Sequence, residues 1–324
     1  MKKFRNYKRL LIVALLLVIF LIVAISQTKI QSPKSSKRKQ VSLIVYGDDS
    51  DRWESLRQGA GLVCENNDAG LSVLTMLSEN DVGEQEEIIE REIENGADAL
   101  IIAPCNSEAI RDYIKERNIS IPVAFVESVI SPDEDLIDIA PDDYQMGYDL
   151  GTSLVENESD IVTVAVVSDN IERDSVALRE KGLMDAIEGK VGKITKWSRN
   201  DYNNKAETRM FIQKSLVSEA TDVIVTFDNS TTDALLDALI NLNKHSRIYS
   251  VTTSNKAVYN LYSKEIISLG YPNEYAMGYL AAMNVLERSY ARKTFADKEI
   301  EYRIIRKENM YDEDNQTLLF PFVN

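Results

Sequence analysis

The chain has 324 residues, enough for one large domain or two of moderate size, and 44% of them are hydrophobic, which allows a sizeable core. The first forty residues hold ten of the 37 Lys and Arg residues and none of the 52 Asp and Glu residues, so residues 41–324 carry a net charge of −25. Such an acidic surface repels nucleic-acid phosphates, which excludes DNA or RNA as a partner.

The N-terminal region has the composition of a membrane segment. A basic tail at 1–9 precedes the uncharged stretch LLIVALLLVIFLIVAISQT at 10–28. At about 1.5 Å per residue a helix of this length reaches roughly 28 Å, close to the thickness of a bilayer core. We therefore predict a cytoplasmic tail, one transmembrane helix at 10–28 and a linker at 29–40. The small residues at 24–26 also suit a signal-peptidase site, so a cleaved, secreted form stays open.

From residue 41 onward, short apolar runs alternate with amphipathic stretches. The first runs are VSLIVY (41–46), LSVLTML (71–77), ADALIIAP (97–104) and IPVAFVE (121–127). Nearly continuous Val, Ile and Leu strands with helical patterns between them predict a parallel sheet that is covered on both faces.

A second series of the same kind follows. Its runs are IVTVAVVS (161–168), KITKWS (193–198), DVIVTF (222–227), RIYSVTT (247–253) and IISLGYP (266–272). A helical pattern at 274–290 and the run EYRIIRKEN at 301–309 come last and suit a return to the first series. The sequence thus predicts two α/β lobes joined by several crossings, with ligand-binding loops at the C-terminal ends of the strands.

Eight motifs, in order along 41–324, resemble those of one known family. They are VSLIVYGDDSDRWESLRQGA, ADALIIAPCNSEAI, IPVAFVES, DIAPDDYQMGYDLG, LREKGL, TFDNSTTDALLDAL, GYPNEYAMGYLAA and IRKEN. The family is that of the periplasmic sugar-binding proteins of the ribose-binding type, here in the membrane-anchored form of Gram-positive bacteria.

This resemblance implies an α/β fold of two Rossmann-like lobes with parallel sheets, joined by a three-strand hinge: the periplasmic binding protein type 1 fold. The N-terminal lobe would comprise 41–141 plus 273–303, and the C-terminal lobe 142–272 plus 304–324.

Matching the ligand contacts of that family residue by residue implies a set of ligand-binding positions. They are Ser50, Arg52, Trp53, Glu127, Tyr202, Asn229, Thr252 and Tyr271. The two arginines that contact ligand in the family are replaced by Ser128 and Ala177, and only Arg179, which is expected to form an internal salt bridge, is kept.

The remaining groups at these positions suit two kinds of ligand. Trp53 and Tyr202 offer aromatic faces, Glu127 a carboxylate and Asn229 an amide, which fits a neutral sugar or polyol. The same aromatic and acidic groups also fit a cationic ligand.

The resemblance implies a non-enzymatic receptor outside the cell that delivers a small polar ligand to an ABC permease. A sensor histidine kinase is the alternative partner. With His245 as the single histidine, and Cys64 and Cys105 expected to be buried thiols, we expect neither a metal site nor a cofactor.

Two further functions are less favoured. A hydrolase would need two facing carboxylates such as Glu127 and Asp143. A DNA-binding regulator of the same two-lobe fold would need a DNA-binding helix pair, where residues 1–40 have an apolar span.

Overall fold

The first strand forms where the sequence has its first unbroken run of Val, Leu and Ile. The computed structural model describes residues 38–47, 50–129, 136–158, 162–198, 205–290 and 300–320. In it β1 (Gln40–Val45) is buried at five of its six residues, because its side chains enter the core on both faces of a parallel sheet.

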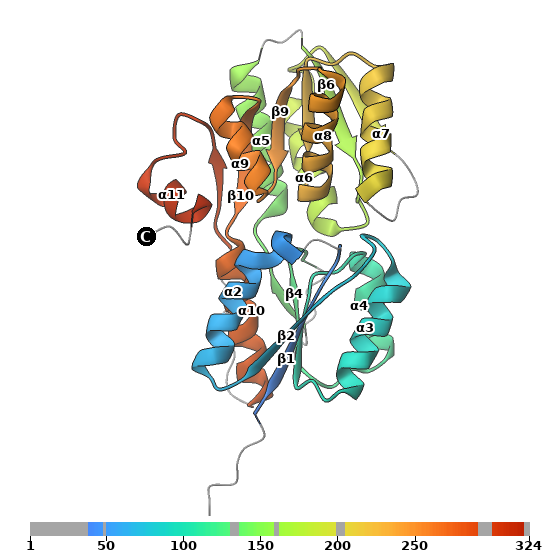
Figure 1. Cartoon of the computed structure of the whole chain (residues 1–324), viewed down its shortest axis with the longest axis vertical. Coiled ribbons are helices and arrows are strands. Elements are labelled where there is room, and N and C mark those ends of the chain that lie inside the picture. Colours follow the sequence, from blue (N-terminus) through green and yellow to red (C-terminus); the bar gives the residue numbers. More distant parts are fainter. Residues whose placement is uncertain are drawn as a thin grey trace, which may run out of the picture. The chain divides into compact units, whose positions relative to one another are not determined.

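Lobe 1 is built on this sheet, whose strand order is β2-β1-β3-β4-β5, with every neighbouring pair parallel. Helices α2 and α10 pack against each other, and α3 packs against α4 (Figure 1). The bounds are η1 (Ser50–Trp53), α2 (Glu54–Asn66), β2 (Gly70–Thr75), α3 (Val82–Glu94), β3 (Ala99–Ile102), α4 (Ser107–Glu116), β4 (Val123–Val126), β5 (Ile137–Ile139) and α10 (Glu274–Ser289).

Lobe 2 has a second sheet of order β11-β10-β9-β8-β6-β7, parallel except for the antiparallel pair β10–β11. One hydrophobic cluster covers each face of this sheet. The bounds are α5 (Asp143–Asn157), β6 (Thr163–Ser168), α6 (Asp174–Ile187), β7 (Lys193–Ser198), α7 (Lys205–Ser218), β8 (Val223–Thr226), α8 (Asn229–Leu242), β9 (Arg247–Val251), α9 (Asn255–Ser263), β10 (Ile266–Pro272), β11 (Tyr302–Ile305) and α11 (Glu313–Leu319).

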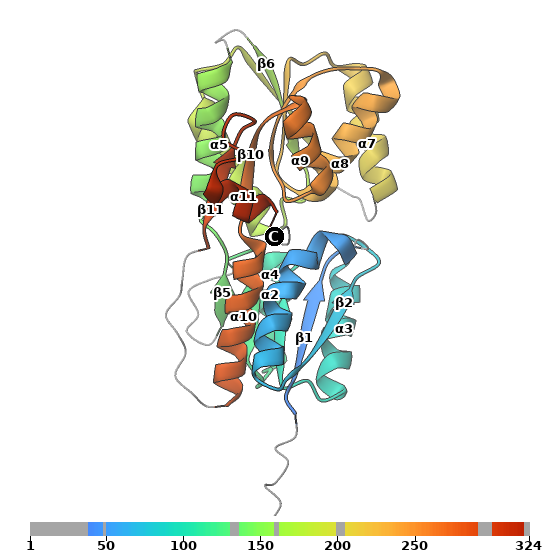
Figure 2. The same cartoon turned by 60° about the vertical axis from the view of Figure 1, so that its left-hand side comes forward.

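The chain passes from lobe 1 to lobe 2 between β5 and α5, back between β10 and α10, and again between α10 and β11 (Figure 2). Because Tyr302 already pairs with Pro272 of β10, the chain has returned to lobe 2 by that residue. Strand β11 therefore spans the lobe boundary predicted between residues 303 and 304.

Strand β5 is described only by the structure, and the transmembrane helix only by the sequence prediction. Strand β5 is only three residues long, IDI, and the apolar pattern did not reveal it. The predicted transmembrane helix at 10–28 lies outside the described residues, and among those described no helix is both long and apolar enough to cross a bilayer.

The same packing device recurs in both lobes. Helices α2 and α10 touch at Gly59 and Gly278, and helices α5 and α6 touch at Gly147 and Gly182. A Cβ added at any of the four would lie 2.0 Å from a carbonyl oxygen of the facing helix. Only glycine permits this approach, so these positions keep α2 against α10 in lobe 1 and α5 against α6 in lobe 2.

Substitution in helix α2 tests this packing. Gly59→Ala should lower the free energy of unfolding by roughly 3 kcal/mol, because the new methyl group overlaps the facing helix. Gly61→Ala, two residues along the same helix, should raise it by up to about 1 kcal/mol, because its Cβ meets only Leu71 at 3.9 Å and alanine favours the helix. Urea unfolding of both variants measures the difference, and equal stabilities would contradict the packing described.

Candidate functional site

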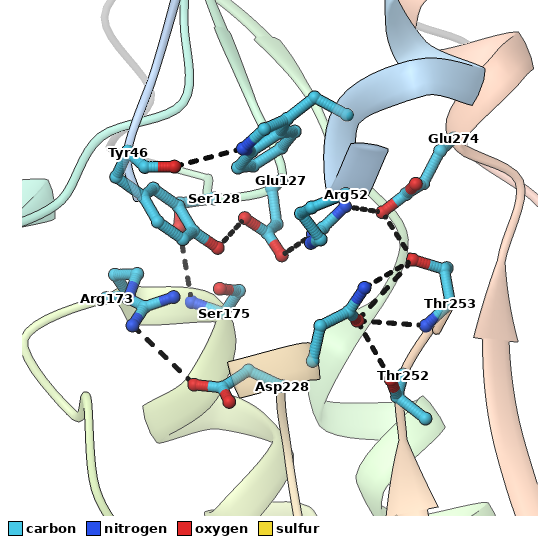
Figure 3. Close-up of polar contacts among 12 residues, drawn as sticks. Tyr46, Arg52, Glu127, Ser128, Arg173, Ser175, Asp228, Thr252, Thr253 and Glu274 are labelled. Carbon is cyan, nitrogen blue, oxygen red and sulfur yellow. Dashed lines mark hydrogen bonds and ion pairs between the residues drawn. The ribbon is translucent and has the colours of Figure 1, made fainter. Parts of the chain in front are cut away.

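The C-terminal ends of strands from both lobes face a common cavity of about 610 Å³. From lobe 1 it is lined by Tyr46 and Arg52, which follow β1, and from lobe 2 by Asn229 after β8 and Thr253 after β9. Glu274, at the passage between β10 and α10, completes this part of the wall (Figure 3). The cavity thus lies where open parallel sheets usually bind ligands.

Arg52, in the wall, connects three segments of the chain. Its guanidinium lies over the Trp53 ring, 4.0 Å from the centroid. Nη2 donates to Glu127 Oε1 at 2.9 Å, and Nη1 donates to Glu274 (Figure 3). Because Arg52 is only 10% exposed, these contacts are shielded from water and hold the first loop, the end of β4 and the start of α10 together.

Glu127 is held from several directions. Its backbone has a φ of +70°, a left-handed conformation that is uncommon for a residue other than glycine. Tyr46 donates to its Oε2 at 2.5 Å. Burial alone would raise the pKa of Glu127, but attraction to Arg52, Arg179 and Arg173 outweighs burial and lowers it. Glu127 is therefore a carboxylate at neutral pH.

Arg173, the N-cap residue of α6, is the site arginine that sequence matching missed. It is 1% exposed, its guanidinium lies over the Tyr46 ring at 4.1 Å, and Nη2 lies 3.6 Å from carboxylate oxygens of Glu79 and Asp228. The ion pair with Glu79 joins the two lobes. No periodic signal marks a residue in a polar loop six positions before Arg179, so Arg173 could not be selected from the sequence pattern.

A hydrogen-bonded chain continues the site into lobe 2. Asn229 Oδ1 accepts from Thr252 Oγ1 at 2.9 Å and from the Thr253 amide at 3.0 Å. Thr253 Oγ1 donates in turn to Glu274 Oε1 at 3.1 Å. Burial, together with the nearby Glu127, raises the pKa of Glu274 despite its pairing with Arg52. Hydrogen bonds thus connect Asn229 and Thr253 of lobe 2 with Glu274, at the start of α10 in lobe 1.

Apart from Trp53, the predicted site residues divide into three groups. Arg52, Asn229 and Tyr271 line the cavity. Glu127 and Thr252 lie one hydrogen bond behind it, on Arg52 and Asn229 respectively. For Tyr202, and for the side chain of Ser50, the prediction falls outside the described residues; the backbone of Ser50 begins η1.

Trp53 corrects one expectation. It was predicted to offer an aromatic face to the ligand, but it is 1% exposed and is not part of the cavity wall. Its Nε1 donates to the Tyr46 carbonyl at 3.0 Å, which turns the indole into the core, and the adjacent Arg52 covers its face. Trp53 therefore supports the site from behind.

Arg179 forms the internal salt bridge that the sequence predicted. Its Nε donates to Asp143 Oδ1 at 2.7 Å, and its Nη1 donates to the Phe227 carbonyl at 2.9 Å. Glu127 lies 3.9 Å from the same guanidinium. Glu127 and Asp143 thus both face Arg179, whereas a hydrolase would need them to flank a substrate.

Within the described residues no group of three or more His, Cys, Asp and Glu side chains could hold a metal ion. Cys64 and Cys105 are both buried and form no disulfide in that part of the chain. The polar groups that line the cavity are guanidinium, ammonium, carboxylate, amide and hydroxyl groups.

Comparisons with known proteins agree on the fold. A family model described as the periplasmic binding protein domain matches residues 41–290. A search of curated protein sequences finds no match.

Several solved structures share the fold that the family model indicates. A carbohydrate transporter solute-binding protein from Agrobacterium radiobacter, in complex with D-arabinose, is 18% identical with a TM-score of 0.77, over 88% of this chain and 100% of that one. The periplasmic component of an ABC-type sugar transport system from Hahella chejuensis is 22% identical with a TM-score of 0.74, over 82% and 99%. GanP, a glucose-galactose binding protein from Geobacillus stearothermophilus, is 17% identical with a TM-score of 0.73, over 85% and 99%. At such identities the similarity establishes the fold.

The buried pair at the first passage predicts a pH dependence of stability. Burial raises the pKa of Asp143 from 3.8 to about 7, against the attraction of Arg179. Between these values the folded protein holds a proton that the unfolded chain releases, so stability falls as the pH rises through this window. Asp143→Asn cannot release that proton, and its loss of stability from pH 5 to pH 7 should be smaller by on the order of 1 kcal/mol per pH unit.

Urea unfolding at both pH values measures this effect. Asp312→Asn, at the exposed N-cap of α11, where the side chain makes no capping hydrogen bond, is the control and should follow the native protein. Parallel curves for all three proteins would contradict a protonated Asp143.

Proposed function

The chain belongs to the periplasmic binding protein family, and from that premise we propose that it is a non-catalytic receptor outside the cell, which closes two lobes around a small, neutral sugar or polyol. The observation that carries this proposal is the composition of the cavity wall. Arg52 is paired with Glu127 and Glu274, and Arg173 with Glu79 and Asp228, so each of these two guanidinium groups faces two carboxylates. The other two basic side chains of the wall, Arg209 and Lys256, both pair with Asp237.

This charge pairing favours a neutral ligand over an anion. An anionic ligand would approach two guanidinium groups that four carboxylates already offset. A hydroxyl group, in contrast, both donates and accepts, so it matches carboxylate oxygens, guanidinium N–H groups and the amide of Asn229 without bringing a charge into the cavity. A ligand with an amine is a second possibility that the excess of carboxylates supports.

The structural neighbours support a sugar as well. The Agrobacterium radiobacter protein was solved with D-arabinose, and a solute-binding protein from Agrobacterium vitis with D-fucose. Both belong to transport systems, which supports an ABC permease as the partner of this chain.

Closure requires that the lobes move about the passages between them. The three passages of the chain would act as the hinge, as is known for periplasmic binding proteins as a class. The ligand shifts the equilibrium toward the closed state by the contacts that it makes only there. The hydrogen-bonded chain from Arg52 through Glu274 to Thr253 runs across one passage, so the site and the hinge are physically connected.

The apolar stretch at 10–28 supports a receptor anchored in the cell membrane by one helix, with the folded part outside. An anchored receptor also suits a sensor histidine kinase as partner, because the closed lobes would stay near the outer domain of the kinase. Deleting the chain separates the two: uptake of the sugar stops if the permease is the partner, whereas only sugar-dependent transcription stops if the kinase is.

Binding is tested by thermal denaturation of the full chain with D-arabinose, D-galactose, D-glucose, D-ribose and their polyols. At a thousandfold excess over Kd a ligand adds about 4 kcal/mol to stability, which raises the melting temperature by several degrees. Asn229→Ala should weaken binding tenfold or more, since it removes an amide from the wall. Asn66→Ala, at the exposed end of α2, should bind as the native protein does.

A stabilisation of equal size in the Asn229 and Asn66 variants would contradict the site. No stabilisation by any of these compounds in the native protein would contradict sugar binding.

A further inference from the structure

A second cavity of about 800 Å³ adjoins the first one. Ser55, Tyr271 and Glu274 line both, so the two spaces meet at these side chains. The second cavity, which we call the α2–α11 groove, lies between α2 of lobe 1 and α11 of lobe 2, with the start of α10 and strand β11 beside it (Figure 2). It therefore extends the first cavity along the side of the molecule where α11 lies.

Helix α11 is fixed to lobe 2, which gives the groove a firm second wall. Leu319 is 4% exposed within the core of that lobe, and Asn315 Nδ2 donates to the Asn309 carbonyl at 2.8 Å. Arg303 of β11 donates to Asp314 at 3.3 Å. The neighbouring Thr317 and Leu318 of the same helix line the groove.

The groove has the mixed surface that sugar rings require. Gln58 and Asn273 supply amides, and Tyr275 a phenol. Leu62, 40% exposed on α2, and Leu318 on α11 supply apolar surface on the facing walls. Sugars present C–H faces to apolar groups and hydroxyls to polar ones, so this alternation suits a neutral glycan.

The size of the first cavity points the same way. Its volume of about 610 Å³ lies within the range of roughly 300–1,000 Å³ of pockets that take drug-sized ligands. A single sugar ring with its hydroxyls fills only part of such a space. A ligand of two or more rings would fill it and continue past Ser55 and Tyr271 into the groove.

Charge restricts the kind of glycan. The groove is lined by Glu65, Glu301 and Asp314, with Arg303 as the positive side chain of its wall. That guanidinium is already bonded to two of these acids, at 2.6 Å to Glu301 and 3.3 Å to Asp314. Uronic acids and sulfated sugars would meet an excess of negative charge there.

From the continuity of the two cavities, we propose that the α2–α11 groove is a second sugar subsite and that the ligand is a neutral oligosaccharide. One terminal unit occupies the cavity between the strand ends, and the next unit lies between α2 and α11. This inference rests on the proposed function, because it names the class of sugar that the same receptor binds.

Calorimetric titration of the full chain with homologous series tests the proposal. The probes are D-galactose, β-1,4-galactobiose and β-1,4-galactotriose, together with the matching series from D-xylose, L-arabinose and D-glucose. In the series that binds, the disaccharide should bind at least tenfold more tightly than the monosaccharide.

Two variants test whether the tighter binding of the disaccharide arises in the α2–α11 groove. Thr317→Trp places a large ring in the groove and should reduce the preference for the disaccharide to less than threefold, while the affinity for the monosaccharide stays the same. Gln316→Trp, on the exposed side of the same helix and outside both cavities, is the control and should keep the tenfold preference.

The possible failures are distinguishable. If no sugar of any length binds, the proposed function and the subsite both fail. If a monosaccharide binds at least as tightly as its disaccharide, or if Thr317→Trp and Gln316→Trp keep the same preference, sugar binding stands and the subsite is overturned.

Discussion

The Arg52 guanidinium, held between Glu127 and Glu274, is the contact on which the site depends. It connects the loop after β1, the end of β4 and the passage into α10, three segments far apart in the sequence. Because all three side chains are largely buried, removing Arg52 would leave two carboxylates without this partner in a medium of low dielectric constant. Trp53 behind Arg52 and Thr253 beyond Glu274 extend this contact into the core of lobe 1 and into lobe 2.

The two lobes achieve the same geometry by the same means. In each lobe two helices have a glycine at their contact, so that the backbone of one helix lies against a carbonyl oxygen of the other. One helix of each pair, α5 or α10, directly follows a passage between the lobes. Rigid helix pairs next to the passages concentrate bending in the short connections. The proposed closure of two stiff lobes requires rigid helix pairs and flexible connections, and the packing at Gly147 and Gly278 supplies the rigid helix pairs.

The sequence was informative about strands and much less so about side chains of the site. Continuous Val, Ile and Leu runs such as 41–46 predicted the sheets because burial on both faces demands them, whereas the three-residue β5 is too short to show a pattern. Spacing placed Arg52 and Trp53 at a strand end, but which of them faces the cavity depends on the turn of η1 and on the bond from the indole to a backbone carbonyl. Arg173 depends on the packing of one lobe against the other, which no local pattern encodes.

A distance between the lobes shows whether sugar closes them about the passages. Helices α3 of lobe 1 and α7 of lobe 2 lie on the same side of the molecule (Figure 1). Spin labels at Glu87→Cys and Lys214→Cys, both exposed, report their separation, while Cys64 and Cys105 are buried. If sugar closes the lobes, the distance distribution should become shorter and narrower when a sugar that binds by calorimetry is added to saturation. An unchanged distribution at saturation would contradict this closure.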